Sequence, residues 1–456
     1  MANHGLDMPV NMPVGLTRSR QQTTDALPAG APELLRPVVQ AGSYFYLLAG
    51  VLVGTIAVGL GAYLTQLRYG LMVTGMSNFY SWGLYITNFV FFIGVSHAGT
   101  LVSAILRVTG AEWRRPITRM AEVITGVALL IGAPMVLIDL GRIDRVYNLV
   151  IHGRLQSPLL WDVFSVTTYL VGSIVFLYLP LIPDLARCYP YLKDRYPVRA
   201  RIYKILSLGW QGTPEQVRLL ERAMAIMAVV IMPVAISVHT VVSFIFSMTL
   251  REGWHSTIFG PYFVIGAIYS GVAAIIVAMA LFRKFYQLEK YITPLHFRRL
   301  GYLLLASGLV YLYMTFAEYL TVFYGSEESG STLTKALFTG QFRGVFWSAI
   351  ILTFSPLLVT ALGRWTGIPG LVLGAVVVNI GMWLKRYMII TPTLANPYIP
   401  IQNAPPYAGF YWPTWVEWSI TAGALAGFIL LYVLFSKLFP IISIWETEEH
   451  TEGREA

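Results

Sequence analysis

Charged residues are the feature that this sequence most lacks. Asp, Glu, Lys and Arg make up 12% of its 456 residues, whereas 56% are hydrophobic. A soluble domain carries roughly twice that charged fraction. Charge-free stretches such as 69–106, 223–250 and 253–282 exceed the roughly 20 residues with which a helix crosses a bilayer. They show no period-2 alternation of the kind found in membrane barrels. The chain is therefore predicted to be an all-α integral membrane protein.

Cysteine is almost absent as well, since Cys188 is the only one in the sequence. A single cysteine excludes a disulfide framework and a cysteine-ligated iron–sulfur cluster within this chain.

The basic residues are spread unevenly along the chain. Of the 32 Lys and Arg residues, 23 lie in alternate segments that begin with the N-terminus. The positive-inside rule then predicts a multi-pass protein of the bacterial inner membrane with both termini in the cytoplasm. The net charge is +9, but the basic residues lie mostly on one side of the membrane. We therefore expect them to contact lipid and not nucleic acid.

Ten transmembrane helices are predicted from the apolar stretches. They lie near 44–66, 83–108, 117–140, 161–182, 223–249, 260–282, 298–324, 344–362, 367–389 and 417–438. An offset of 177 residues matches Trp82-Gly83-x-Tyr85 to Phe259-Gly260-x-Tyr262 and pairs His97 with Ala274. This indicates a duplicated four-helix unit, helices 2–5 and 6–9.

The chain is divided into five parts on this basis. They are an N-terminal tail (1–43), helix 1 with the first four-helix unit (44–249), the second unit (250–389), a loop with helix 10 (390–440) and an acidic tail (441–456).

Placing an ionisable side chain inside a membrane span costs free energy, so such residues are candidates for function. In the first unit they are His97, Asp139, Asp162 and His239, with Arg251 just outside and with Trp161, Tyr147 and Trp254 as candidate walls of an outward-opening cavity. Each of these groups could instead have a structural role. Either histidine could bond a backbone carbonyl, Asp162 could cap its helix, and Asp139 could pair with Arg142. In the second unit, the candidates for a proton path are Glu318, Asn379, Tyr311, Tyr313, Tyr319 and Tyr324. Tyrosines also mark membrane interfaces.

Three classes of function fit such residues. They are a quinol site, in which His and Asp exchange the two protons, a haem-b cytochrome anchor with His97 and His239 as axial ligands, and a proton-coupled transporter.

Six segments of the sequence resemble the polysulfide-reductase-like NrfD family of membrane subunits. The resemblance is greatest to the ActC quinol-binding subunit of alternative complex III. The segments are NFVFFIGVSHAGTLVSAILR (88–107), PLLWDVFSVTTYL (158–170), IYKILSLGWQG (202–212), SVHTVVSFIF (237–246), GWHSTIFGPYFVIGAIYSG (253–271) and NIGMWLKRYMII (379–390).

The resemblance implies two four-helix bundles (helices 2–5 and 6–9) with two peripheral helices. It also implies a quinol site in the first bundle near the extracytoplasmic face, with no haem or iron–sulfur cluster in this chain. The implied partners are an iron–sulfur/molybdopterin-like subunit on that face, c-type cytochrome subunits and a paralogous NrfD-like membrane subunit.

We therefore predict a quinol-oxidising subunit that uses menaquinol and passes electrons to its iron–sulfur partner, with proton translocation as a further expectation. His97 is predicted to be the quinol ligand and base, with Asp162 and Asp139 as carboxylates that carry the proton outward. His239, Trp161, Arg251 and Trp254 are predicted to complete the quinol site, and no metal site is expected.

Overall fold

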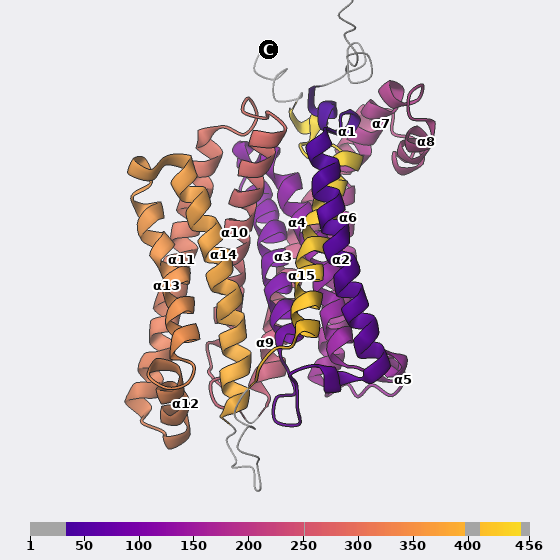
Figure 1. The fold of residues 1–456 in the computed structure, drawn as a ribbon. Helices are drawn as coiled ribbons and strands as arrows, with labels where there is room; N and C mark the ends of the chain where they lie inside the picture. The colour runs from indigo at the N-terminus through magenta and orange to yellow at the C-terminus, as the bar shows by residue number, and fades with distance from the viewer. Residues whose placement is uncertain (1–32, 250, 397–410, 448–456) are drawn as a thin grey trace, which may run out of the picture.

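The structure, a computed structural model, describes residues 33–249, 251–396 and 411–447 (Figure 1). Within these residues, ten helices are long and apolar enough to cross a membrane. They are α2 (Ser43–Tyr69), α3 (Leu84–Val108), α4 (Arg115–Asp139), α6 (Pro158–Tyr178), α9 (Pro214–Ser247), α10 (Phe259–Phe285), α11 (Pro294–Gly325), α13 (Arg343–Ala361), α14 (Gly363–Ala395) and α15 (Trp415–Leu438). The predicted all-α membrane protein with ten spans is confirmed.

Two rings of four helices form the body of the molecule. In the first bundle, α3 packs on α4, α4 on α6, α6 on α9, and α9 closes the ring against α3. The approach of α3 to α4 requires Gly99, because a Cβ there would overlap the carbonyl oxygen of Ala121. In the second bundle, α10, α11, α13 and α14 pack in the same cyclic order. The first helices of the two bundles, α3 and α10, pack against each other.

Two peripheral helices, α2 and α15, complete the membrane domain. They pack on each other, and α15 also contacts α4 and α3 of the first bundle. A Cβ on Gly59 of α2 would lie 2.9 Å from the carbonyl oxygen of Ser419 on α15, so this glycine permits the close crossing. Most of α2 is exposed, which suits a helix that faces lipid.

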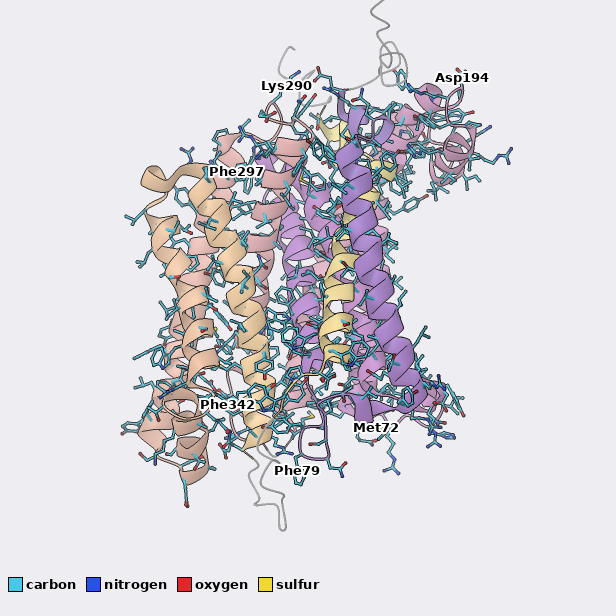
Figure 2. The ribbon with its side chains drawn as sticks, viewed as in Figure 1. Met72, Phe79, Asp194, Lys290, Phe297 and Phe342 are labelled. Atoms are coloured by element: carbon cyan, nitrogen blue, oxygen red, sulfur yellow. The ribbon has the colours of Figure 1, made fainter. Side chains whose placement is uncertain are left out.

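The short elements mark the two ends of the molecule. Helices α7 (Leu181–Leu192) and α8 (Pro197–Leu206) lie at one end, and α5 (Asn148–Ile151) and α12 (Glu328–Phe338) lie at the other (Figure 1). Figure 2 places Asp194 and Lys290 at the first end and Met72, Phe79 and Phe342 at the second. The end with α5 and α12 is the one predicted to be extracytoplasmic, and it is called the outer end below.

Two helices extend beyond their predicted limits. Helix α9 begins at Pro214 and not near 223, because Thr213 and Gln216 form a capping box. The Thr213 hydroxyl accepts the Gln216 N–H at 3.3 Å, and the Gln216 side-chain oxygen accepts the Thr213 N–H at 3.4 Å. Helix α14 continues to Ala395 and not only to 389. The extension places Lys385 and Arg386 within the helix, not at its end.

Parts of both predicted tails are packed against the helices. Residues 33–39 form η1 (Glu33–Leu35) and α1 (Arg36–Val39), and Leu34 and Leu35 are buried. At the other terminus, the buried Asp184 accepts the backbone N–H groups of Ile444 and Trp445 at 3.0 and 2.9 Å. Its carboxylate also pairs with Arg119 at 2.5 Å.

A second buried carboxylate, Glu446, fixes the same segment. It pairs with Arg107 at 3.0 Å and with Arg114 at 3.4 Å. Burial by itself raises the pKa of the Glu446 carboxyl, but the neighbouring arginines outweigh it, and the pKa lies below its usual value. The chain from Pro440 to Thr447 is therefore attached to the first bundle by charge as well as by packing.

Candidate functional site

The two intramembrane histidines of the first bundle are in direct contact. His97 lies midway along α3, and His239 lies eight residues before the end of α9. Their ring centroids are 4.3 Å apart, and both side chains are wholly buried. The ring of Tyr169 on α6 lies 4.9 Å from that of His97. Helices α3 and α9 thus bring together the two histidines, and α6 adds Tyr169, which the sequence analysis did not single out.

The hydrogen bonds of the two histidines differ. The Nδ1 atom of His97 lies 2.6 Å from the carbonyl oxygen of Ile93, and its Nε2 atom lies 2.6 Å from that of Ala235 on α9. A neutral imidazole donates to one of these carbonyls, whereas an imidazolium donates to both. Neither ring nitrogen of His239 forms a hydrogen bond of normal geometry among the described residues, although the backbone of Phe263 on α10 lies near enough to interact with the ring. His97 is therefore fixed between α3 and α9 by two short contacts, whereas His239 is held less tightly.

A row of aromatic rings leads from the outer end of the bundle to His239. Trp82 stacks on Trp254 at a centroid distance of 5.7 Å, and Trp254 meets Phe246 at 5.1 Å. Phe246 lies 6.0 Å from Phe263, which lies 5.8 Å from His239. Trp254, predicted as a wall of the site, is part of this row. Flat apolar surfaces of this kind suit a planar, hydrophobic ligand.

The first predicted carboxylate, Asp162, is buried at the outer end of α6. It is the fifth residue of the helix, and Ser157 occupies the N-cap position, so Asp162 does not cap the helix. Its Oδ1 atom has no hydrogen-bond partner among the described residues. The adjacent Trp161 donates its indole N–H to the carbonyl oxygen of Leu155 at 2.5 Å. Asp162 is thus a buried polar group without a structural role as a cap.

Asp139 and Arg251 lie further from the histidines in the fold. Asp139 is the last residue of α4, and its charged neighbour is Glu417 of α15, which lies outside the bundle. Arg142 pairs with Asp144 at 2.9 Å, and the described residues show no ion pair between Asp139 and Arg142, which was the alternative structural role for Asp139. Arg251 is half-buried in the loop after α9, and its Nη1 atom has no partner in the described parts of the chain.

Two cations that the sequence reasoning missed, Lys385 and Arg386, are buried on α14. Arg386 on α14 is 1% exposed, its guanidinium lies 4.9 Å from the ring centroid of Phe263, and its Nη1 and Nη2 atoms have no partner in the described chain. A Cβ on Gly266 would lie 3.1 Å from Nη2, so glycine makes room for it. The ammonium of Lys385 lies 3.4 Å from the Tyr319 hydroxyl. Because the helix was predicted to end near 389, both residues fell in its last turn, where charged side chains at the membrane edge are ordinary.

A pocket of about 380 Å³ opens near the outer end of the second bundle. It is bounded by the 252–259 segment, α11, α12 and α14, and its polar lining includes Glu318, Tyr319 and Lys385. The Glu318 carboxylate accepts the Ser256 hydroxyl at 2.7 Å. Glu252, His255 and Glu327, which also line the pocket, have ligand atoms within 4.8 Å of one another, so these residues are able to hold a cation.

The predicted proton-path tyrosines fall into two groups. Tyr311 is buried and stacks on Tyr262 at 4.8 Å, and the Tyr262 hydroxyl bonds that of Thr315 at 2.9 Å. Tyr313 and Tyr324 are 70% and 91% exposed, so they lie outside any internal path. The remaining candidate, Asn379, donates to the carbonyl oxygen of Ala375 on its own helix at 3.0 Å.

The fold and these polar groups define a multi-pass helical membrane protein with ionisable side chains in its apolar interior. The chain belongs to the NrfD family: residues 72–397 match the family described as "Polysulphide reductase, NrfD".

Curated relatives extend over most of the chain. A protein of Mesobacillus selenatarsenatis named as a subunit of selenate reductase is 24% identical over 433 residues, which are 90% of this chain and 97% of the relative. The "Hdr-like menaquinol oxidoreductase integral membrane subunit" of Archaeoglobus fulgidus is 23% identical over 90% of this chain and 96% of its own. A Halobacterium salinarum protein named for a dimethyl sulfoxide reductase membrane subunit is 32% identical over 241 residues, about half of each chain (52% and 51%).

Proposed function

We propose that this chain is the quinol-oxidising membrane subunit of a multi-subunit electron-transfer complex of the alternative complex III type, with menaquinol as its substrate. Membership of the NrfD family supports the proposal, as does a relative named as a menaquinol oxidoreductase subunit. The observation that carries it is the buried contact between His97 and His239, with ring centroids 4.3 Å apart at the end of an aromatic row. Such a pair supplies proton acceptors at the end of an apolar row of aromatic rings.

Oxidation of a quinol to a quinone releases two electrons and two protons, so a proton acceptor must meet the ring hydroxyl. The hydrogen bonds favour His239 for this role, because its nitrogens form no hydrogen bond of normal geometry in the described chain and interact only with the nearby Phe263 backbone. His97, held between two carbonyl oxygens, positions His239 through the contact between their rings. This exchanges the roles that the sequence assigned to the two histidines.

Two routes carry protons outward in this proposal. In the first bundle the route begins at Asp162, whose Oδ1 atom is buried and without a partner in the described residues, with Asp139 beside α15 as a second carboxylate. In the second bundle, Glu318, Tyr319 and Lys385 line the outer pocket, and the Lys385 ammonium contacts the Tyr319 hydroxyl. Proton translocation coupled to quinol oxidation would use the second route.

Electrons leave through an iron–sulfur/molybdopterin-like partner docked at the outer end, and then through c-type cytochrome subunits. A paralogous NrfD-like subunit is a further proposed partner. This arrangement requires both termini to be cytoplasmic in a bacterial inner membrane. A topology reporter fused after Ala456 is expected to lie on the cytoplasmic side. A reporter inserted in the 325–340 segment is expected to lie on the extracytoplasmic side. Two reporters on the same side would refute this orientation.

The haem alternative fits the histidines less well. With metal–nitrogen bonds near 2 Å on opposite sides of an iron, two axial rings have centroids roughly 6 Å apart. The 4.3 Å spacing observed here is shorter. A Soret band from the chain expressed alone, lost on changing either histidine, would restore the haem assignment.

A photoreactive azido-menaquinone added to the complex tests the proposal directly. We expect cross-links in peptides of α3, α9 and the 246–263 segment, suppressed by excess menaquinol. The chain alone should bind the probe but should not oxidise quinol, whereas a transporter would function alone. Robust proton-coupled solute uptake by the chain alone in liposomes, or cross-links confined to the second-bundle pocket, would refute the site as proposed.

A further inference from the structure

The short helix α8 carries an apolar face that the described chain leaves uncovered. Val198, Ile202 and Ile205 follow one another at spacings of four and three residues, which places them on one side of a helix. Leu208 comes shortly after the helix ends. The four side chains are 76%, 47%, 65% and 69% exposed. A row of large aliphatic groups open on one helix face indicates a contact beyond this chain.

The opposite side of α8 fixes the helix to the protein. The Tyr203 hydroxyl donates to the carbonyl oxygen of Leu438 at 2.5 Å, and its ring stacks on Phe439 at 6.0 Å. Arg199 donates to the carbonyl oxygen of Val38 at 2.8 Å. Because these contacts hold the buried side of α8, the apolar row is turned away from the helix bundles and cannot fold back onto them.

Basic residues accompany this apolar row. Lys193, Arg195, Arg201 and Lys204 are exposed, and Asp194 is the one acidic residue between 193 and 204. Helices α7 and α8 extend sideways beyond α2 and α6 at the level where the membrane spans end (Figure 1). Asp194 lies at the far edge of this projection (Figure 2). Since lipid surrounds the spans, a segment that projects sideways at this level lies over the bilayer surface.

We propose that α8 docks on the bilayer, with Val198, Ile202, Ile205 and Leu208 inserted at the boundary between headgroups and acyl chains. The flanking Lys and Arg side chains bind the headgroups of anionic phospholipids. An apolar face beside cationic residues is the composition of interfacial helices, and the anionic leaflet attracts the basic residues. This inference does not depend on the quinol assignment, because it concerns the end of the molecule that is distant from the outer face.

Spin labels on the full-length chain in lipid nanodiscs test the proposal. Cysteine is introduced by Ile202→Cys or Ile205→Cys, and by Glu215→Cys as an exposed control at the start of α9. The native Cys188 is wholly buried, and the unmodified chain treated with the same reagent measures any reaction at that residue. Collision rates with oxygen and with a water-soluble nickel chelate are compared in phosphatidylglycerol and phosphatidylcholine nanodiscs.

At 202 and 205 we expect oxygen collisions to exceed nickel collisions several-fold in phosphatidylglycerol, with the reverse at 215. The membrane depth of the labels at 202 and 205 should decrease in phosphatidylcholine. The double variant Arg201→Gln/Lys204→Gln should have the same label depth in both lipids. Nickel collisions at 202 equal to those at 215 would overturn the membrane contact. Exclusion of both reagents only in the assembled complex would also overturn it, in favour of a protein partner. Equal depth in the two lipids would overturn the role of anionic headgroups.

Discussion

Substitution of His239 and His97 by glutamine is predicted to separate proton acceptance from positioning. Glutamine occupies a similar volume and forms hydrogen bonds, but it does not take up a proton at neutral pH. His239→Gln therefore removes the proposed acceptor while breaking no hydrogen bond of normal geometry in the described chain. His97→Gln instead disturbs the contact to the Ala235 carbonyl, which joins α3 to α9 at 2.6 Å.

The two variants differ in the size and kind of effect. Loss of a general base typically costs a hundred- to ten-thousand-fold in rate, about 2.7–5.4 kcal/mol of activation free energy. Loss of an interhelical hydrogen bond in a membrane protein costs about 1 kcal/mol of unfolding free energy. His239→Gln should thus slow quinol oxidation at least a hundred-fold with an unchanged thermal midpoint. His97→Gln should lower the midpoint and reduce the rate by a smaller factor.

The assay is oxidation of a menaquinol analogue by the assembled complex between pH 6 and 8, with thermal unfolding measured on the same preparations. His296→Gln is the matched control, because His296 takes part in a capping box at the start of α11, far along the chain from the histidine pair. If His97→Gln abolishes turnover while His239→Gln preserves it, the roles are those that the sequence assigned. If both variants retain near-normal rates, the quinol site lies elsewhere.

Three further predictions concern other charged groups. Glu318→Gln should reduce proton translocation in vesicles at least several-fold while quinol oxidation changes less than about twofold, because Glu318 lines the outer pocket and not the histidine site. Asp184→Asn should lower the unfolding free energy by about 3 kcal/mol, since it leaves the buried Arg119 without its ion pair. Glu446 has a lowered pKa in the folded protein, so its stabilising effect is complete above its unfolded pKa of about 4.3 and is lost as the pH falls through the lower folded value. Glu446→Gln should therefore destabilise the protein at pH 7, and the defect should shrink only as the pH falls through the lowered pKa of the folded protein, as measured by thermal unfolding.

Matched controls use exposed residues of the same type. Glu328→Gln, Asp194→Asn and Glu215→Gln should each leave the corresponding measurement unchanged. Normal proton translocation by Glu318→Gln would exclude the second-bundle route. An unchanged thermal midpoint in Asp184→Asn would show that the C-terminal segment is not held by this ion pair. A Glu446→Gln defect that stays the same down to the lowest pH at which the protein remains folded would contradict an electrostatic origin.

The sequence by itself determined the spans of this protein and the types of its polar residues. Length and hydropathy are local properties, because a helix in lipid must satisfy its own backbone hydrogen bonds whatever surrounds it. For this reason the ten spans could be identified from the sequence, and His97, His239 and Asp162 could be identified as ionisable groups within or at the ends of those spans. The offset of 177 residues also indicated the four-helix repeat seen in the two bundles.

Only the tertiary structure decided which of these groups meet. Contact between His97 and His239 depends on how α3 crosses α9, and the different hydrogen bonding of the two rings depends on one backbone carbonyl of the facing helix. The burial of Lys385 and Arg386 depends on where α14 ends and on the room left by Gly266. Residue type and spacing do not encode such relations between helices, since side-chain environments arise from contacts between segments far apart in the chain.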